Sequence, residues 1–294
     1  MIRTTKTNKK VTAILTGDWH LQESQPVCRL DDFWETQWQK VDFIWDLQKK
    51  HNCPVIHSGD LFDHWKPSPM LLSKTIERLP YDFWTIYGNH DLPQHNFDLV
   101  HKSGIYVLEK ANILNGLPGN HWGKEGGLID VFPGNVNKRF AVWHVMTYQG
   151  QKPWPDCTDS SAAKILRKNP DFDLILTGHN HKTFVEEYQG RLLVNPGSIF
   201  RTTAAQQDHK PSVFLWYAET NTVERVFIPI QKDVISREHI EVQQERENRI
   251  DAFVSNLNTD WAAKMSFEEN LEKFRQTIKL RESVMDIVYK AIEI

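Results

Sequence analysis

The sequence contains few cysteines, and their spacing argues against one kind of metal site. Only Cys28, Cys53 and Cys157 occur among the 294 residues, with no CxxC pair. This spacing is not that of a zinc site built from thiolates. Three free thiols fit a reducing compartment, so the cysteine content predicts an intracellular, cytoplasmic protein.

Long apolar runs and a basic excess are also lacking. No apolar run approaches the roughly 20 residues of a transmembrane helix, and the polar, basic stretch 1–10 has no apolar signal core. The formal net charge of -3 does not indicate nucleic-acid binding, although cationic metals in an acidic site would escape such a count. We therefore expect a soluble protein without membrane contact, in which residues 1–10 form a solvated arm.

The order of helix and strand patterns predicts the fold class. Helices are expected from Asp32 to Lys50 and from Pro69 to Leu79, between apolar strands, and a short strand is expected at 105–108. Mainly strand patterns follow from Phe140 to Ile228. The 11 Trp and 15 Phe supply enough buried area for a sizeable core. This order predicts an α/β fold with two packed mixed β-sheets flanked by helices.

The character of the chain changes after Asp233. Residues 234–294 are charged and favour helix, with a capping-box pattern at 266–269 and apolar residues on one helical face from Leu271 to Ile292. We expect a catalytic domain at 1–233 and a small helical appendage at 234–294. The apolar face is expected either to dock on a partner protein or to pack on its own domain.

An apolar stretch that ends in Asp, Asn or His occurs five times. In open α/β sheets, sites form beyond the carboxyl ends of the strands, so these polar residues are expected to meet at one edge. The five stretches, with the polar residues that follow them, are 11–16 with Asp18 and His20, 54–58 with Asp60, 83–87 with Asn89 and His90, 140–143 with His144, and 174–177 with His179 and His181.

This pattern predicts a site for two divalent metal ions. Seven residues are candidate ligands: Asp18, His20, Asp60, Asn89, His144, His179 and His181. Seven ligands are too many for one ion with an open position and suit two ions that share a bridge. Mixed carboxylate, amide and imidazole ligands favour manganese, iron or zinc over calcium, with magnesium as a further candidate.

Each of these residues also has an ordinary structural interpretation. A lone Asp-x-His or His-x-His is more often polar surface, Asp60 could cap a turn, and His144 could be a core histidine. The metal site is favoured because all five groups fall at strand ends. His90 follows Asn89 and is expected to act on the leaving oxygen of a phosphate ester rather than on a metal. His64, His95 and His101 have no predicted role.

The strand-end groups resemble, in order, the five signature motifs of the calcineurin-like metallophosphoesterases. The resemblance implies one metal bound by Asp18, His20, Asp60 and His181, and another bound by Asp60, Asn89, His144 and His179, with Asp60 as the bridge and His90 as the catalytic histidine. The segments 61–63, 67–69 and 194–198 are most similar to the SbcD-type DNA-repair nucleases, including their phage versions.

The SbcD-like resemblance implies a manganese-dependent DNA exonuclease or endonuclease. Its expected partner is an SbcC-like ATPase, and a homodimer is expected through helices near 68–79 and 96–102, where Met70, Leu71, Phe97 and Val100 are interface or core. One alternative is a phosphodiesterase or phosphatase acting on small nucleotides or phosphoproteins. Another is a non-catalytic DNA-binding scaffold, against which the intact ligand set speaks.

Overall fold

A computed structural model describes residues 10–124 and 137–259, together with residues 276 and 284. The chain divides into two units, Met1–Ser236 and Arg237–Ile294. In the second unit the structure describes helix α5, Glu238–Thr259. Residues 1–9, the capping box expected at 266–269 and the apolar face expected from Leu271 to Ile292 lie outside the described residues.

The larger sheet of the first unit has six strands. Strands β1 to β4 are parallel neighbours, and β11 and β12 continue the sheet beyond β1 as antiparallel strands. The strands, in sheet order, are β12 (Thr222–Phe227), β11 (Ser212–Tyr217), β1 (Ala13–Thr16), β2 (Val55–His57), β3 (Phe83–Thr85) and β4 (Asn115–Gly116).

The smaller sheet has four strands and is also mixed. Strands β5, β8 and β10 are parallel, and β9 closes the edge as an antiparallel strand. The strands, in sheet order, are β5 (Phe140–His144), β8 (Leu174–Gly178), β10 (Arg191–Asn195) and β9 (Phe184–Tyr188). A two-stranded ribbon of β6 (Thr147–Tyr148) and β7 (Ser160–Ser161) lies between β5 and β8 in the sequence.

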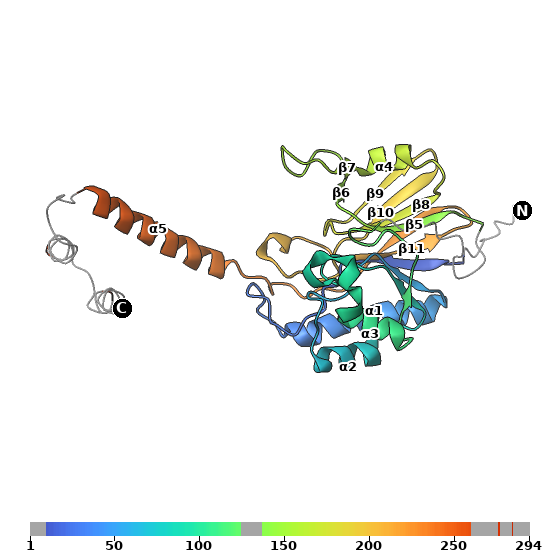
Figure 1. Ribbon diagram of the computed structural model, residues 1–294, viewed down its shortest axis with the longest axis horizontal. Coiled ribbons are helices and arrows are strands. Elements are labelled where there is room, and N and C mark those ends of the chain that lie inside the picture. The colour runs from blue at the N-terminus through green and yellow to red at the C-terminus, as the bar shows by residue number, and fades with distance from the viewer. Residues whose placement is uncertain (1–9, 125–136, 260–275, 277–283, 285–294) are drawn as a thin grey trace, which may run out of the picture. The chain divides into compact units, whose positions relative to one another are not determined.

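The two sheets pack face to face with helices on both outer faces. In β1, Leu15 points between the sheets, where it packs with Val142 of β5 and Leu176 of β8, whereas Ile14 points to the helices on the other side. Figure 1 shows α1, α2 and α3 on the outer side of the larger sheet and α4 on the outer side of the smaller one. The predicted α/β fold with two mixed sheets flanked by helices is confirmed.

Side-chain caps fix the beginnings of three helices. Asp32 accepts a hydrogen bond from the Glu35 amide at the start of α1 (Phe33–His51), and Ser68 accepts one from Leu71 at the start of α2 (Pro69–Arg78). Ser161 caps α4 (Ala162–Lys168) in the same way. Such caps satisfy amides that lack a partner within the helix. Short 3-10 helices lie at Pro93–His95, Phe97–Lys102 and Ala204–Gln206.

The strand expected at 105–108 is wrong, because the segment belongs to helix α3, Gly104–Lys110. The Ser103 hydroxyl accepts a hydrogen bond from the Tyr106 amide and caps the helix. Ile105 and Leu108, three residues apart, are fully buried, whereas Val107 is exposed. A short apolar run has no periodicity that separates strand from helix, and here the cap decides.

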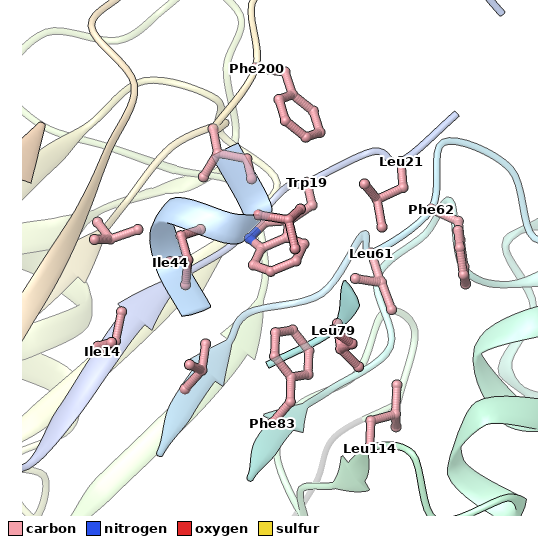
Figure 2. Packing of buried hydrophobic residues seen from close by; sticks show 14 of the residues in the cluster. Ile14, Trp19, Leu21, Ile44, Leu61, Phe62, Leu79, Phe83, Leu114 and Phe200 are labelled. Atoms are coloured by element: carbon pink, nitrogen blue, oxygen red, sulfur yellow. The ribbon is translucent and has the colours of Figure 1, made fainter. Parts of the chain in front are cut away.

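The buried indole of Trp19 anchors the loop that carries Asp18 and His20. Figure 2 shows this ring among Leu21, Leu61 and Phe83. Trp19 is fully buried, and its Nε1 donates a hydrogen bond of 2.8 Å to the Thr16 hydroxyl. The loop between the two predicted ligands is therefore fixed by the core itself.

Truncation of this ring should destabilise the fold. Because it leaves a large cavity, Trp19→Ala is expected to lower the free energy of unfolding by about 3–5 kcal/mol. Urea denaturation measures the loss. Trp154→Ala is the matched control, since Trp154 is 48% exposed and should cost little. Equal stability of the two variants would show that Trp19 does not anchor the loop.

No helix in the described part of the chain combines the length and apolar character needed to cross a membrane.

Candidate metal centre

The carboxyl ends of five parallel strands deliver the predicted site residues. β1, β2 and β3 are neighbours in the larger sheet, and β5 and β8 are neighbours in the smaller one. The loops after β1 and β2 are joined by backbone hydrogen bonds, from the Asp18 amide to Gly59 (3.1 Å) and from the His20 amide to Asp60 (3.0 Å). Two distant parts of the sequence thus form one rigid base for the site.

The first group of potential ligands consists of Asp18, His20 and His181. One ligand atom of each lies within 4.8 Å of the others. The Nε2 atoms of His20 and His181 are 3.1 Å apart. Ligand atoms about 2.1 Å from a shared ion lie roughly 3 Å apart, so this spacing fits a common metal. The buried Oδ2 atom of Asp18 has no hydrogen-bond partner among the described residues, as expected for an oxygen that binds a cation.

The second group consists of Asp60, His144 and His179 and is completed by Asn89. The ligand atoms of the first three lie within 4.8 Å of one another. The Oδ1 atom of Asn89 lies 3.0 Å from His144 Nε2 and 2.9 Å from His179 Nδ1. These four side chains come from the ends of four different strands, β2, β3, β5 and β8, and converge on one point. The structure therefore brings together all seven residues that the sequence predicts as ligands.

Asp60 lies between the two groups. Its Oδ2 atom is 3.2 Å from His144 Nε2 in the second group and 3.6 Å from His20 Nε2 in the first. Its Oδ1 atom accepts a hydrogen bond of 2.8 Å from the His90 amide, which fixes the carboxylate. A single side chain that reaches both groups has the position that a bridging ligand requires.

A hydrogen bond sets the tautomer of His144. Its Nδ1 lies 2.7 Å from the carbonyl oxygen of Ser58, which can only accept, so Nδ1 carries the proton. Nε2 faces Asp60 and Asn89 and is the atom able to bind a metal. A hydrogen bond from the other ring nitrogen fixes the ring orientation of metal-binding histidines in this way.

Burial and mutual contact shift the titration of the site. Burial opposes ionisation of Asp60, but His144, His20 and His90 together outweigh it and keep the pKa of Asp60 far below its usual value. Burial would lower the pKa of His144, but Asp60 raises it to about 9. Burial and the neighbouring His20 lower the pKa of His181 to about 4. Asp60 is therefore an anion and His181 a neutral imidazole at pH 7, the forms that bind metals.

Four of the predicted ligands have a strained backbone conformation. Asp18, His20, Asp60 and His179 have positive φ values of 50°, 48°, 58° and 77°. Non-glycine residues rarely adopt this conformation, which costs about 1–3 kcal/mol for each residue and persists only where the surroundings enforce it. The core around these loops, including Trp19, enforces it here. Such strain is typical of functional sites.

Gly59 and Gly88 lie beside the candidate ligands, and both are required mainly because a side chain would not fit there. Gly88 does not need the backbone freedom of glycine, because its φ is not positive. A Cβ atom on Gly88 would instead collide with the Asp60 carboxylate. Gly59 does have a positive φ of 97°, and a Cβ there would also lie 2.6 Å from His144 Nδ1. Both glycines give the metal ligands room to approach.

His90 lies beside both groups with one ring nitrogen available. Its Nδ1 is 2.7 Å from the carbonyl oxygen of Asp63, so Nδ1 carries a proton and Nε2 is the atom that a substrate can meet. Its ring packs edge-on against that of His20, with centroids 4.6 Å apart. His20, Asp63 and His90 also form a third group whose ligand atoms lie within 4.8 Å of one another. Proximity alone therefore does not separate a catalytic role from a ligand role.

Asp63 supports two site residues. The sequence pattern marked it only as the last residue of the segment 61–63. Its backbone carbonyl orients His90, and its carboxylate lies 3.4 Å from His20 Nδ1. The hydrogen bond from His20 lowers the pKa of Asp63. The sequence signal for this role is that Asp63 stands three residues after Asp60, because a tight turn can bring such neighbours close together in one loop.

Asp91 holds the turns that carry the second group. Its fully buried carboxylate accepts hydrogen bonds from the amides of Asp60 (2.8 Å), Leu61 (3.1 Å), Phe62 (3.2 Å) and Gly88 (3.0 Å). Burial, followed by the nearby Asp60, raises the pKa of Asp91 to about 7. The sequence shows that Asp91 follows His90, but no sequence pattern indicates that its carboxylate accepts hydrogen bonds from the backbone amides after β2.

Asp91→Asn is expected to lower metal affinity. The new amide group would point hydrogens at backbone amides, and the turn that carries Asp60 should shift. Loss of such supporting contacts typically costs about 10–100-fold in metal affinity. Titration calorimetry with Mn²⁺ measures the change, with the exposed Asp98→Asn as control. Equal affinities of the two variants would exclude the positioning role.

One further histidine and one tryptophan contact residues of the candidate metal centre, and two other histidines are exposed. His95 contacts the site through the backbone, since its Nδ1 lies 2.9 Å from the Asn89 carbonyl. His64 and His101 are exposed. Trp122, which the sequence did not single out, stacks on His179 with ring centroids 4.8 Å apart and an interplanar angle of 28°. The sequence around Trp122 is rich in turn residues and has no periodic pattern, so it did not predict this contact.

The residues present fit two divalent metal ions. The two groups supply carboxylate, amide and imidazole atoms at suitable spacing, together with the unpartnered Oδ2 atom of Asp18. No thiolate takes part, since all three cysteines lie outside the groups. This set of ligands is consistent with borderline divalent ions.

Comparisons with known proteins place these motifs in one family model. The model described as "Calcineurin-like phosphoesterase superfamily domain" matches residues 18–221. No curated protein sequence matches the chain significantly.

Solved structures with a similar fold have low sequence identity and low TM-scores. An archaeal phosphodiesterase is 15% identical over 73% of this chain and 98% of its own, with a TM-score of 0.42. Zinc-bound Vps29 from Entamoeba histolytica is 16% identical over 74% and 99%, with a TM-score of 0.37. A putative 5′-nucleotidase from Staphylococcus aureus is 12% identical over 80% and 58%, with a TM-score of 0.45.

Proposed function

The chain belongs to the calcineurin-like phosphoesterase superfamily, and we propose that this metal-dependent phosphoesterase uses two ions to hydrolyse small phosphodiesters. The observation that carries the proposal is the position of Asp60, whose Oδ2 atom lies 3.6 Å and 3.2 Å from the nearest imidazole nitrogens of the two groups. Bound divalent ions would supply positive charge for the phosphoryl oxygens and lower the pKa of an attacking water.

In this proposal His90 supplies the proton for the leaving oxygen. Its Nδ1–H donates to the Asp63 carbonyl, which holds the ring, and in the imidazolium form Nε2 carries a second proton. As the P–O bond breaks, that proton passes to the departing oxygen and His90 becomes neutral. The Asp63 carboxylate lies in the same cluster as the His90 ring.

The charge of the site favours a diester over a monoester. A phosphomonoester brings two negative charges, which arginine or lysine clamps usually help to neutralise. Among the described residues, no lysine or arginine side chain forms a hydrogen bond or ion pair with Asp18, Asp60 or Asp63. The singly charged diester is therefore the better match.

The DNA-nuclease hypothesis stays a prediction, as do the SbcC-like partner and the homodimer. Of the residues expected at a dimer interface, Leu71 is buried in the core, Phe97 and Val100 are half-buried, and Met70 is 56% exposed. Only Met70 presents most of its side chain to a second chain. A small diester as substrate requires none of these partners.

Hydrolysis of matched substrates tests the proposal. Bis(p-nitrophenyl) phosphate, p-nitrophenyl phosphate and end-labelled duplex DNA are each incubated with the full chain and Mn²⁺, with and without EDTA. We expect the chromogenic diester to be cleaved faster than the monoester, and EDTA to stop the reaction. Faster cleavage of the monoester would reject the diester preference, and degradation of DNA alone would favour the nuclease.

A further inference from the structure

A cavity of about 410 Å³ lies next to the segments that carry Asn89 and Trp122, with Tyr87 and His121 in its lining. It is lined by the end of the β3 segment, the 3-10 helix Phe97–Lys102, α3 and residues 116–121. A volume of this size accommodates a nucleobase and falls in the range of small-molecule sites, about 300–1,000 Å³. No residue of the candidate metal centre lines it.

The cavity has an aromatic wall. The ring of Phe97 lies 4.8 Å from that of His121 with an interplanar angle of 33°, and 5.8 Å from that of Tyr87. Tyr106 contributes a further ring to the lining. Aromatic walls bind flat rings by stacked and edge-on contacts with little loss of conformational freedom. The shape therefore suits a planar heterocycle.

The polar groups of the cavity are few and have defined hydrogen-bond roles. Among the described residues, Glu109 supplies the carboxylate of the lining: its Oε2 accepts a hydrogen bond from the Tyr87 hydroxyl, and its Oε1 lies 3.4 Å from the Nζ of the exposed Lys110. His121 Nδ1 accepts a hydrogen bond of 3.1 Å from the Tyr87 amide, so Nε2 carries the proton and can donate. A heterocycle with N–H donors and a carbonyl acceptor matches this pair, and guanine has both on one edge.

The cavity and the metal centre share two chain segments. Tyr87 lines the cavity and stands two residues before the ligand Asn89. His121 lines the cavity, and its neighbour Trp122 stacks on His179. The Trp122 amide donates a hydrogen bond of 2.9 Å to the Tyr87 carbonyl and joins the segments. A base bound here would lie beside the phosphate site.

We propose that this cavity binds the guanine base of a nucleotide substrate, with the aromatic wall stacking on the ring and Glu109 accepting from its N–H groups. The proposal rests on the proposed phosphodiesterase function for its biological meaning. Binding of the base itself requires neither hydrolysis nor metal, so the two can fail separately.

Guanosine binding to the full chain in EDTA tests the site by calorimetry. We expect measurable binding, weakened about tenfold or more by Glu109→Gln, because the new amide N–H₂ would face the N–H groups of the base. Glu77→Gln on α2 is the matched control, since Glu77 also pairs with a helical lysine but lies outside the cavity. Phe97→Leu, which keeps apolar volume but removes the ring, should also weaken binding.

A kinetic comparison separates this site from the hydrolytic centre. The p-nitrophenyl ester of guanosine 5′-phosphate and methyl p-nitrophenyl phosphate share the same scissile bond. Glu109→Gln should raise KM about tenfold for the guanosine ester. It should leave kcat and KM unchanged for methyl p-nitrophenyl phosphate. Absence of guanosine binding, or equal binding by Glu109→Gln and the wild type, would overturn the proposal even if both esters are hydrolysed. Failure to hydrolyse either ester while guanosine still binds would reject the phosphodiesterase function alone.

Discussion

Asp60→Ala is expected to abolish hydrolysis and to lower the occupancy of both metal ions. The Asp60 Oδ2 atom lies near a histidine of each ligand group, so its removal takes a ligand from both groups. The substitution also removes the anion that raises the pKa of His144 to about 9. Metal analysis after dialysis, together with diester hydrolysis, measures both effects.

Two controls make this result specific to the bridge. Asp46→Ala removes an exposed carboxylate of α1 and should keep two ions per chain. Asp60→Asn keeps the size of the side chain and an oxygen for the His90 amide, so it separates loss of charge from local collapse. Two ions per chain retained in folded Asp60→Ala would show that the bridge assignment is wrong.

The convergence of the candidate ligands could be predicted because it depends on local sequence order and on one rule of topology. Apolar stretches ending at Asp18, Asp60 and His144 are visible in the sequence, and parallel strands bring their carboxyl ends to one edge. The identity and convergence of these residues follow without any coordinates.

Features that depend on long-range packing could not be predicted. The role of Asp91 arises because its carboxylate meets amides some thirty residues earlier in the chain, after β2. The need for Gly88 comes from the Asp60 carboxylate against it rather than from its own backbone angles. Trp122 reaches His179 across 57 positions of the sequence. None of these contacts leaves a periodic pattern.

The misassigned segment 105–108 shows the limit of short apolar runs. Four residues fit a strand as well as one turn of helix, and the deciding groups are the Ser103 cap and the burial of Ile105 with Leu108. The error matters for function, because α3 carries Glu109 and Tyr106 into the cavity. A strand at this place would direct the side chains of Tyr106 and Glu109 differently. The cavity could therefore not be predicted from the sequence.

His90→Asn is expected to lower kcat by about a hundred- to ten-thousand-fold, the usual contribution of general acid catalysis. Asparagine can still donate to the Asp63 carbonyl, and the backbone amide that binds Asp60 remains. The variant lacks an acidic proton at the position of Nε2. Both metals and KM for a small diester should therefore change little, because only the transition state needs this proton.

The third group of potential ligands makes metal content the deciding measurement. His20, Asp63 and His90 are close enough to hold an ion, so a ligand role for His90 predicts loss of metal in His90→Asn. A role as general acid predicts full occupancy with low kcat, and a substrate with a better leaving group should then recover much of the rate. His64→Asn, at an exposed histidine of the neighbouring loop, is the control. Unchanged kcat in His90→Asn would remove this residue from the mechanism, because a leaving alkoxide without a proton donor departs more slowly.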